Sequence, residues 1–82
     1  MEILLLTQED CAFCDQAKEI LDRLSAEWGF AVRTLRLDSA EGQALAERGG
    51  VLFAPGVFID GEPFSYGRLS ERRLRRTLDR RR

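Results

Sequence analysis

The apolar positions of this chain form short runs separated by polar turns. Residues 3–6 are four consecutive aliphatic side chains, typical of a buried strand, and we expect that strand over residues 2–7. Residues 13–28 carry apolar side chains at three- and four-residue spacing, which predicts an amphipathic helix that ends at Gly29 in a left-handed cap. Residues 30–37 alternate apolar and polar in their second half and predict a second strand. A strand, a helix and a strand in this order predict two parallel strands joined by a right-handed crossover.

The next segment predicts a second helix. Asp38 and Glu41 stand three residues apart, as in a capping box with Asp38 as the N-cap. We therefore expect a helix over residues 39–48, ended by the pair Gly49-Gly50. The side chains expected to face inward are those of Ala40, Ala44 and Leu45.

The last third of the chain predicts a hairpin followed by a third helix. Two short apolar runs, residues 57–59 and 63–66, flank Asp60-Gly61-Glu62, which is a strong hairpin signal. The second run begins with a proline, so we expect it at the edge of a sheet, where a missing N–H costs least. Ser70 is positioned to cap a helix with a narrow apolar face.

Composition and run lengths restrict the class of protein. The 82 residues are 44% apolar and 33% charged, which is typical of one small folded domain over residues 1–82. The longest aliphatic run has four residues, too few to cross a membrane. Met1 leads directly into the first strand, without the charged region and cleavage site of a signal peptide. We therefore expect a cytoplasmic monomer that does not bind membranes, with a frayed end at residues 80–82.

The net charge of −1 hides a strong asymmetry. Residues 68–82 hold eight arginines against two acidic side chains, a charge of +6, whereas residues 1–67 hold five basic and twelve acidic side chains, a charge of −7. One interpretation is a solvated helix whose dipole favours basic residues near its C-terminus. The other is an anion-binding tail for an acidic partner or nucleic acid. We favour the first, and no aromatic residue interrupts the arginines, which argues against nucleic acid.

Two cysteines, Cys11 and Cys14, lie between the first strand and the first helix. The free N–H groups and the dipole of a helix N-terminus stabilise a thiolate, which is the form that attacks disulfides. Cys14 lies one turn further on, where it can attack a mixed disulfide formed at Cys11. The loop between them is too short to staple a fold. The pair is therefore interpreted as a reversible redox couple or half of a metal site rather than an inert structural pair.

The element order β-α-β-α-β-β-α, with Cys-x-x-Cys after the first strand and Ala-Pro-Gly-Val-Phe-Ile-Asp-Gly at 54–61, resembles the glutaredoxin branch of the thioredoxin superfamily. This resemblance implies an α/β fold with a four-stranded mixed sheet in the order 2-1-3-4 and three helices on its two faces. It implies that Cys11 is the nucleophile, that Cys14 is the resolving thiol, and that the two form a redox-active disulfide. It also implies a cis peptide bond between Ala54 and Pro55, packed against the cysteines, where backbone groups pair with an extended substrate.

The same resemblance suggests further substrate-binding residues. They are Phe13 beside the nucleophile, Ala54 and Pro55, and Gly67 and Arg68 in the turn before the last helix. Core packing is an equal alternative for Phe13, and a plain surface role is the alternative for Arg68. Tyr66 is interpreted as a packing residue.

Two departures from the family pattern concern the thiol. Ala12-Phe13 replaces the usual Pro-Tyr between the cysteines, and the acidic segment 7–10 replaces one that often carries a lysine. Because Glu9, Asp10 and Asp15 oppose a thiolate, we expect the Cys11 pKa to lie nearer that of a free thiol, and not below about 6.

We therefore predict a glutaredoxin-like enzyme, a thiol–disulfide oxidoreductase that reduces protein or mixed disulfides. It would need no metal and no tightly bound cofactor. Glutathione or another low-molecular-weight thiol would serve as co-substrate, and a thiol or a reductase would donate electrons. One alternative is an iron–sulfur or metal carrier, which would need a second chain or external thiols, since two Cys and no His cannot complete a four-ligand site. Another is a non-catalytic binding module that uses the Arg-rich helix.

Overall fold

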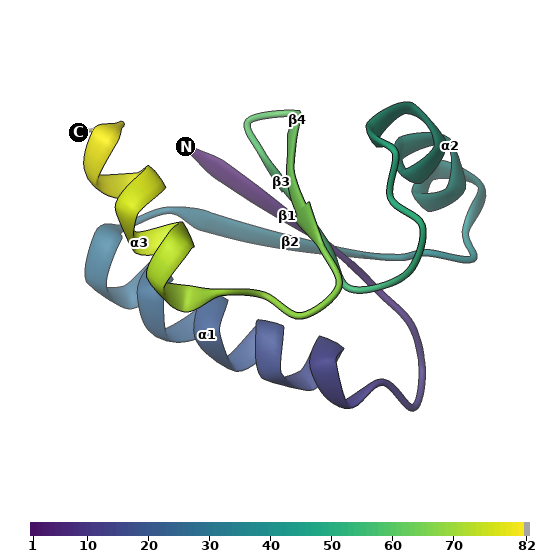
Figure 1. Cartoon of the computed structure of the whole chain (residues 1–82), viewed down its shortest axis with the longest axis horizontal. Helices are drawn as coiled ribbons and strands as arrows, with labels where there is room; N and C mark the ends of the chain where they lie inside the picture. The colour runs from purple at the N-terminus through teal and green to yellow at the C-terminus, as the bar shows by residue number, and fades with distance from the viewer. Residues whose placement is uncertain (82) are drawn as a thin grey trace.

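The computed structural model describes residues 1–81 and contains the predicted order of strands and helices (Figure 1). Every element lies within two residues of its expected position, and the second strand is one residue shorter at each end than expected. The elements are β1 (Glu2–Thr7), α1 (Ala12–Trp28), β2 (Ala31–Arg36), α2 (Ala40–Gly49), β3 (Gly56–Ile59), β4 (Glu62–Tyr66) and α3 (Glu71–Arg80).

The four strands form one mixed sheet in the order β2-β1-β3-β4. β1 pairs with β2 in parallel, whereas β1–β3 and β3–β4 are antiparallel. The register pairs Gly56 with Leu6 on one side and with Tyr66 on the other. The last residues of β1 and β4 and the first residue of β3 therefore meet at one end of the sheet, which we call the site end. The predicted α/β fold and strand order are confirmed.

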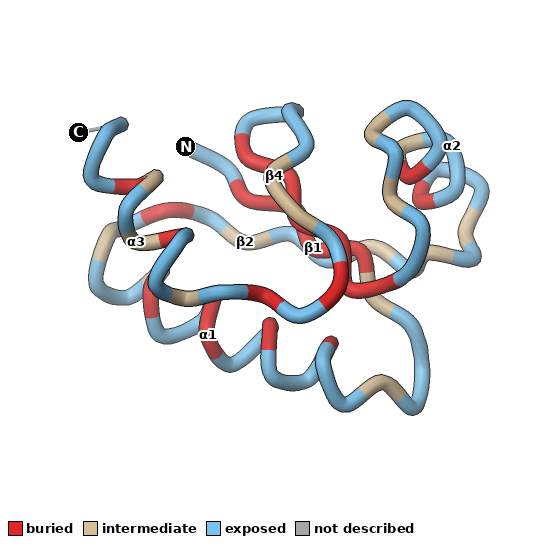
Figure 2. Tube along the Cα trace, in the orientation of Figure 1, coloured by how far each residue is buried: buried red, intermediate tan, exposed pale blue. Residues whose placement is uncertain are grey.

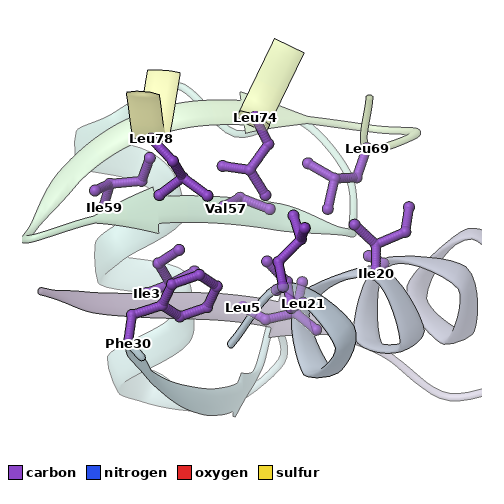
Figure 3. Close-up of a cluster of buried hydrophobic side chains, with 12 residues drawn as sticks. Ile3, Leu5, Ile20, Leu21, Phe30, Val57, Ile59, Leu69, Leu74 and Leu78 are labelled. Carbon is purple, nitrogen blue, oxygen red and sulfur yellow. The ribbon is translucent and has the colours of Figure 1, made fainter. Parts of the chain in front are cut away.

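Alternation along the central strands divides the core into two layers. Figure 2 shows that buried residues run along the central strands. Ile3 and Leu5 of β1 belong to a large cluster under α1 and α3 (Figure 3), whereas Leu4 and Leu6 belong to a smaller cluster under α2. The larger cluster contains Ile3, Leu5, Ala17, Ile20, Leu21, Leu24, Phe30, Val57, Ile59, Leu69, Leu74 and Leu78. The buried residues of the smaller cluster are Leu4, Leu6, Ala46 and Phe58.

The start of α2 differs from the sequence expectation. The N-cap is Ser39, whose Oγ accepts a hydrogen bond from the Gly42 N–H at 3.0 Å. Asp38 is not free to cap because its carboxylate forms a two-point contact with Arg36. The capping-box prediction was therefore wrong.

The inward face of α2 also differs. Ala40 and Ala44 are exposed, and Leu45 is half-buried. The buried positions are Gly42 and Ala46. Only Leu45 of the three residues expected to face inward packs against the core. The reason is the position of the first turn, where Gly42 lies so close to the Arg36 carbonyl that no side chain fits.

The turns and the other two caps agree with the sequence. Gly29 ends α1 at φ 78°, and the Ser70 Oγ accepts from the Arg73 N–H at the start of α3. Asp60 and Gly61 both have positive φ, so they form the tight two-residue turn that an Asp-Gly pair favours. The proline of the second hairpin strand lies in edge strand β4, as expected.

The described part of the chain reaches Arg81. Arg80 is the last residue of α3, and the guanidinium of Arg81 lies 3.3 Å from the Asp60 carboxylate. Fraying at residues 80–82 stays a prediction. Arg82 lies outside the described residues. None of the helices described over 1–81 is long and apolar enough to cross a membrane.

Candidate active site

The two cysteines lie where the chain enters α1. Cys11 is the N-cap residue, with an extended backbone, and Cys14 lies in the first turn. Their sulfur atoms are joined in a disulfide, with the Cα atoms 5.2 Å apart. The Cys14 N–H also donates to the Cys11 Sγ at 3.1 Å. Cys14 is 2% exposed, whereas Cys11 is only half-buried, so solvent and substrates reach Cys11 first.

This local geometry stabilises negative charge on the Cys11 sulfur. The first N–H groups of a helix have no partner within the helix, and here one of them points at Sγ. The helix dipole adds a positive potential at the same place. Asp15 in the first turn acts in the opposite direction, as its charge is negative.

An ion-pair network holds the segment that leads into Cys11. Glu9 accepts from Arg36 Nη1 at 2.8 Å, and Asp38 accepts from Nε and Nη2 of the same guanidinium at 2.9 and 2.8 Å. The contact with Arg36 lowers the pKa of Asp38, and the two carboxylates raise that of Arg36. The charge of Glu9, two residues before Cys11, is thus compensated by a residue of β2.

The loop before β3 brings a proline to the site end. The Ala54–Pro55 peptide bond is cis, in agreement with the sequence expectation. Both residues are buried, and the Pro55 carbonyl accepts from the Gly67 N–H at 2.8 Å. Because Gly56 pairs with Leu6, Pro55 lies beside the end of β1, from which the chain turns towards Cys11 (Figure 1).

Exposed apolar side chains surround this end of the sheet. Residues 1–81 contain five large apolar side chains classed as exposed, and four of them belong to segments at the site end: Phe13, Leu52, Phe53 and Tyr66. We call these four the apolar rim. The Phe53 and Tyr66 rings meet edge to face at 5.2 Å. A Cβ at Gly67 would lie 3.1 Å from the Phe53 ring, so glycine at this position lets the ring lie against the turn.

The glutaredoxin family profile matches residues 3–64, which include both cysteines and the cis proline. The chain belongs to the glutaredoxin family. Its relatives include proteins described as uncharacterized from Mycobacterium tuberculosis and Mycobacterium bovis, which are 37% identical over 96% of this chain and 84% of their own.

Solved structures agree with this assignment. A mutant thioredoxin from Halobacterium salinarum superposes with a TM-score of 0.72 at 25% identity, over 96% of this chain and 72% of that one. A thioredoxin-like protein from Clostridium perfringens gives a TM-score of 0.74 at 21% identity, over 96% and 68% of the two chains, and supports the fold alone.

This glutaredoxin-family site contains most of the residues singled out from the sequence. Cys11, Cys14, Ala54, Pro55 and Gly67 are brought to one end of the sheet by the strand register and the Pro55–Gly67 hydrogen bond. The sulfurs are in contact, and the site is open on the side of Cys11.

Three side chains at this end were left open or misjudged. Phe13 is 51% exposed, which excludes the core-packing alternative. Arg68 is exposed and forms no ion pair with another residue of 1–81. Tyr66 packs on Phe53, but at 41% exposure it is also a surface residue.

Leu52, Phe53 and Arg36 are three further residues at this end of the sheet that the sequence does not predict. The available signal for the first two was an apolar pair in a loop directly before Ala-Pro, which a buried strand would also produce. Nothing in the sequence connects Arg36 with Glu9, because their contact depends on the pairing of β1 with β2.

Within residues 1–81, no group of three or more His, Cys, Asp or Glu side chains could hold a metal ion. A metal or cluster at this site would therefore need ligands from outside the described chain, as the carrier alternative requires.

Proposed function

We propose that this protein is a thiol–disulfide oxidoreductase in which Cys11 is the nucleophile and Cys14 the resolving thiol. The observation that carries the proposal is the unequal burial of two bonded sulfurs at a helix N-terminus. Cys11 is accessible and receives an N–H hydrogen bond, whereas Cys14 is buried one turn away. A nucleophile must meet its substrate, and a resolving thiol needs only to reach the nucleophile.

The reaction follows from this arrangement. In the reduced protein, the Cys11 thiolate attacks one sulfur of a substrate disulfide, and the other substrate sulfur leaves as a thiolate that takes up a proton. Cys14 then loses its proton and attacks Cys11 of the mixed disulfide, which releases the second substrate thiol. The protein is oxidised to the Cys11–Cys14 disulfide, and the substrate gains two electrons and two protons.

The surroundings of Cys11 support a protein disulfide as substrate. The apolar rim offers exposed Phe13, which lies between the two cysteines in the sequence, and the ring pair of Phe53 and Tyr66. Polypeptide segments bind such surfaces better than a small charged thiol does. The backbone next to the cis proline is the proposed partner of an extended substrate chain. Ala54, Pro55 and Gly67 would form that part of the site.

Electrons must return to the disulfide from a donor. The proposed donor binds and dissociates in each cycle, and it is either a low-molecular-weight thiol such as glutathione or a flavoprotein reductase. The proposed reaction needs no tightly bound cofactor. It places the reaction in the cytoplasm, where thiols are kept reduced. Asp10 and Asp15 flank Cys11 and disfavour the binding of a negatively charged co-substrate such as glutathione. Arg68 is the cation that would favour such a co-substrate.

Turnover of a peptide disulfide tests the proposal. The wild-type protein, with dithiothreitol as reductant, should reduce insulin faster than the reductant alone. Cys11→Ser should abolish this acceleration, whereas Ser25→Ala, at a half-buried position near the far end of the same helix, should keep it. Cys14→Ser should accumulate a mixed disulfide through Cys11, visible as added mass. Full turnover by Cys11→Ser, or no acceleration by a folded wild type, would contradict the proposal.

A further inference from the structure

The arginines around α3 divide into two groups. Arg75 contacts Glu27 and Glu71, Arg81 contacts Asp60, and the Arg73 guanidinium lies 4.8 Å from the centre of the Phe64 ring. Arg80 donates to Thr77. Three further arginines are spaced four residues apart: Arg68, Arg72 and Arg76. Their guanidinium groups form no hydrogen bond or ion pair with any residue of 1–81. We call these three the arginine row.

The helix geometry explains the division. Leu74 and Leu78 are buried against the sheet, and Glu71 and Arg75 face α1, as their ion pairs with Arg23 and Glu27 show. At 100° per residue, positions 72 and 76 lie on the side away from the sheet. Some arginines near α3 thus have carboxylate partners within the chain, whereas the arginines of this row have none among residues 1–81.

Two residues of the arginine row line a groove near the active site. It lies between the first turns of α1 and the start of α3 and has an apolar floor of Ile20 and Leu69, whose side chains lie next to each other (Figure 3). Gln16, two residues after Cys14, lines one end, and Arg68 and Arg72 also line it. Arg68 directly follows Gly67, which is bonded to the cis proline.

The charges of this groove suit an anion. Its one carboxylate, Glu71, is held by Arg75 and Arg23, which lower its pKa. The N-terminus of α3 adds the positive end of a helix dipole beside Arg72. Residues 1–67 carry a charge of −7, so the remaining surface repels an acidic segment and directs it to this place.

We propose that the groove and the arginine row bind an acidic segment of the client protein while its disulfide meets Cys11. This inference rests on the proposed function and specifies the client. Guanidinium groups bind carboxylates with two hydrogen bonds each, and Arg68 and Arg72 both line the groove. Nucleic acid is disfavoured because no exposed aromatic ring lines the groove for base stacking, and because the rest of the chain is acidic.

A pair of peptides tests the proposal in the full chain with Cys14→Ser, so that only one reaction step occurs. Each peptide has one cysteine activated as a 2-pyridyl disulfide, and a neighbouring run of residues is glutamate in one peptide and glutamine in the other. The Cys11 thiolate attacks the peptide sulfur, a mixed disulfide forms, and pyridine-2-thione leaves with the electron pair. The release of this thione gives a second-order rate constant for each peptide.

The expected result is a rate ratio of about tenfold in favour of the glutamate peptide at low salt. The ratio should approach one at about 1 M salt, where the screening length is only ~3 Å. Adding Arg72→Gln and Arg76→Gln should lower the ratio at least threefold, which is about half of a tenfold effect on a logarithmic scale. Arg48→Gln is the matched control, because Arg48 is an exposed arginine on α2 that forms no ion pair with another residue of 1–81.

Three outcomes would overturn the proposal. The first is equal rates for the two peptides. The second is a fall with Arg48→Gln that is as large, per charge removed, as the fall with the double variant, which would show that only net charge matters. The third is that labelled oligouridylate binds through Arg72 and Arg76 while the glutamate peptide has no advantage. The proposed function is judged separately, since its failure would appear in this assay as no reaction of Cys11 with the glutamine peptide, whatever the effect of glutamate.

Discussion

The two halves of the candidate site come from layers that are packed very differently. The cysteines enter α1, which with α3 covers a cluster of twelve buried side chains. The cis-proline loop follows α2, which covers a cluster with only four. Cys11 is therefore held by the dense layer, whereas Leu52 and Phe53 before the cis proline follow a sparsely packed helix and remain 76% and 54% exposed.

This difference suggests a division of tasks. Disulfide exchange needs two sulfurs at fixed positions, and the dense layer provides this. Recognition of varied clients needs a surface that can adjust, and few buried contacts make local opening less costly. Changes in the α1 layer should therefore affect the whole protein, whereas changes in the α2 layer should affect substrate binding more than redox chemistry.

The largest expected effect is the loss of a core side chain under α1. Leu21 is fully buried, so Leu21→Ala should lower the free energy of unfolding by about 2–5 kcal/mol. Half-buried Leu45→Ala under α2 should cost about half of that or less. Urea unfolding measures both. An equal loss of unfolding free energy in the two variants would show that both layers contribute equally to stability, which would contradict the difference between them.

A second change loosens only the α2 layer. A Cβ at Gly49 would lie 2.8 Å from two atoms of the Phe58 ring. Alanine gains up to about 1 kcal/mol over glycine in a helix, but such overpacking costs about 1–3 kcal/mol. Gly49→Ala should therefore destabilise the protein and raise KM for a peptide disulfide, with an unchanged reduction potential. Exposed Gln43→Ala is the control for helix propensity. A changed reduction potential, or a higher stability of Gly49→Ala, would contradict the division of tasks between the two layers.

The third change acts on the charge near the nucleophile. Arg36→Gln removes the partner of Glu9, so an uncompensated carboxylate two residues from Cys11 should raise the pKa of its thiol by a few tenths of a unit. Thiolate absorbance of the Cys14→Ser protein measures this. Arg33→Gln is the matched control, because Arg33 also lies on β2 but pairs with Glu41. An equal effect of both variants, or no reversal by adding Glu9→Gln, would contradict this explanation.

The smallest expected effect concerns the contact of α3 with α1. Arg75 and Arg23 lower the pKa of Glu71, so its carboxylate stabilises the fold above about pH 4 and loses this contribution as it is protonated at lower pH. Glu71→Gln should lower Tm slightly at pH 7 and not at about pH 3. The side chains of these ion pairs are only partly buried and reach solvent, so the difference is small. Thermal unfolding at both pH values checks it, and an effect independent of pH would contradict the ion-pair explanation.

Periodicity and turn chemistry predict most of this fold. The apolar spacing of α1, the Asp60-Gly61 turn and the Ser70 cap are local signals, and each is found where the sequence places it. The start of α2 was mispredicted because two candidate caps are adjacent. The choice between them depends on Arg36, which engages Asp38 and leaves Ser39 to cap.

The site is less visible in the sequence than the fold. The cysteine pair and Ala54-Pro55 are readable as motifs, whereas the apolar rim and the Arg36–Glu9 contact depend on which strands become neighbours. Likewise, the composition shows eight arginines near the C-terminus, but only the fold shows which of them pair with carboxylates.

The central claim is that the two cysteines have unequal roles because one is accessible at the start of α1 and the other is buried. The most direct measurement is to reduce the wild-type protein, add less than one equivalent of iodoacetamide at neutral pH, and map the label by mass spectrometry. The account predicts labelling of Cys11 over Cys14 by about tenfold or more. Equal labelling, or preferential labelling of Cys14, would contradict it.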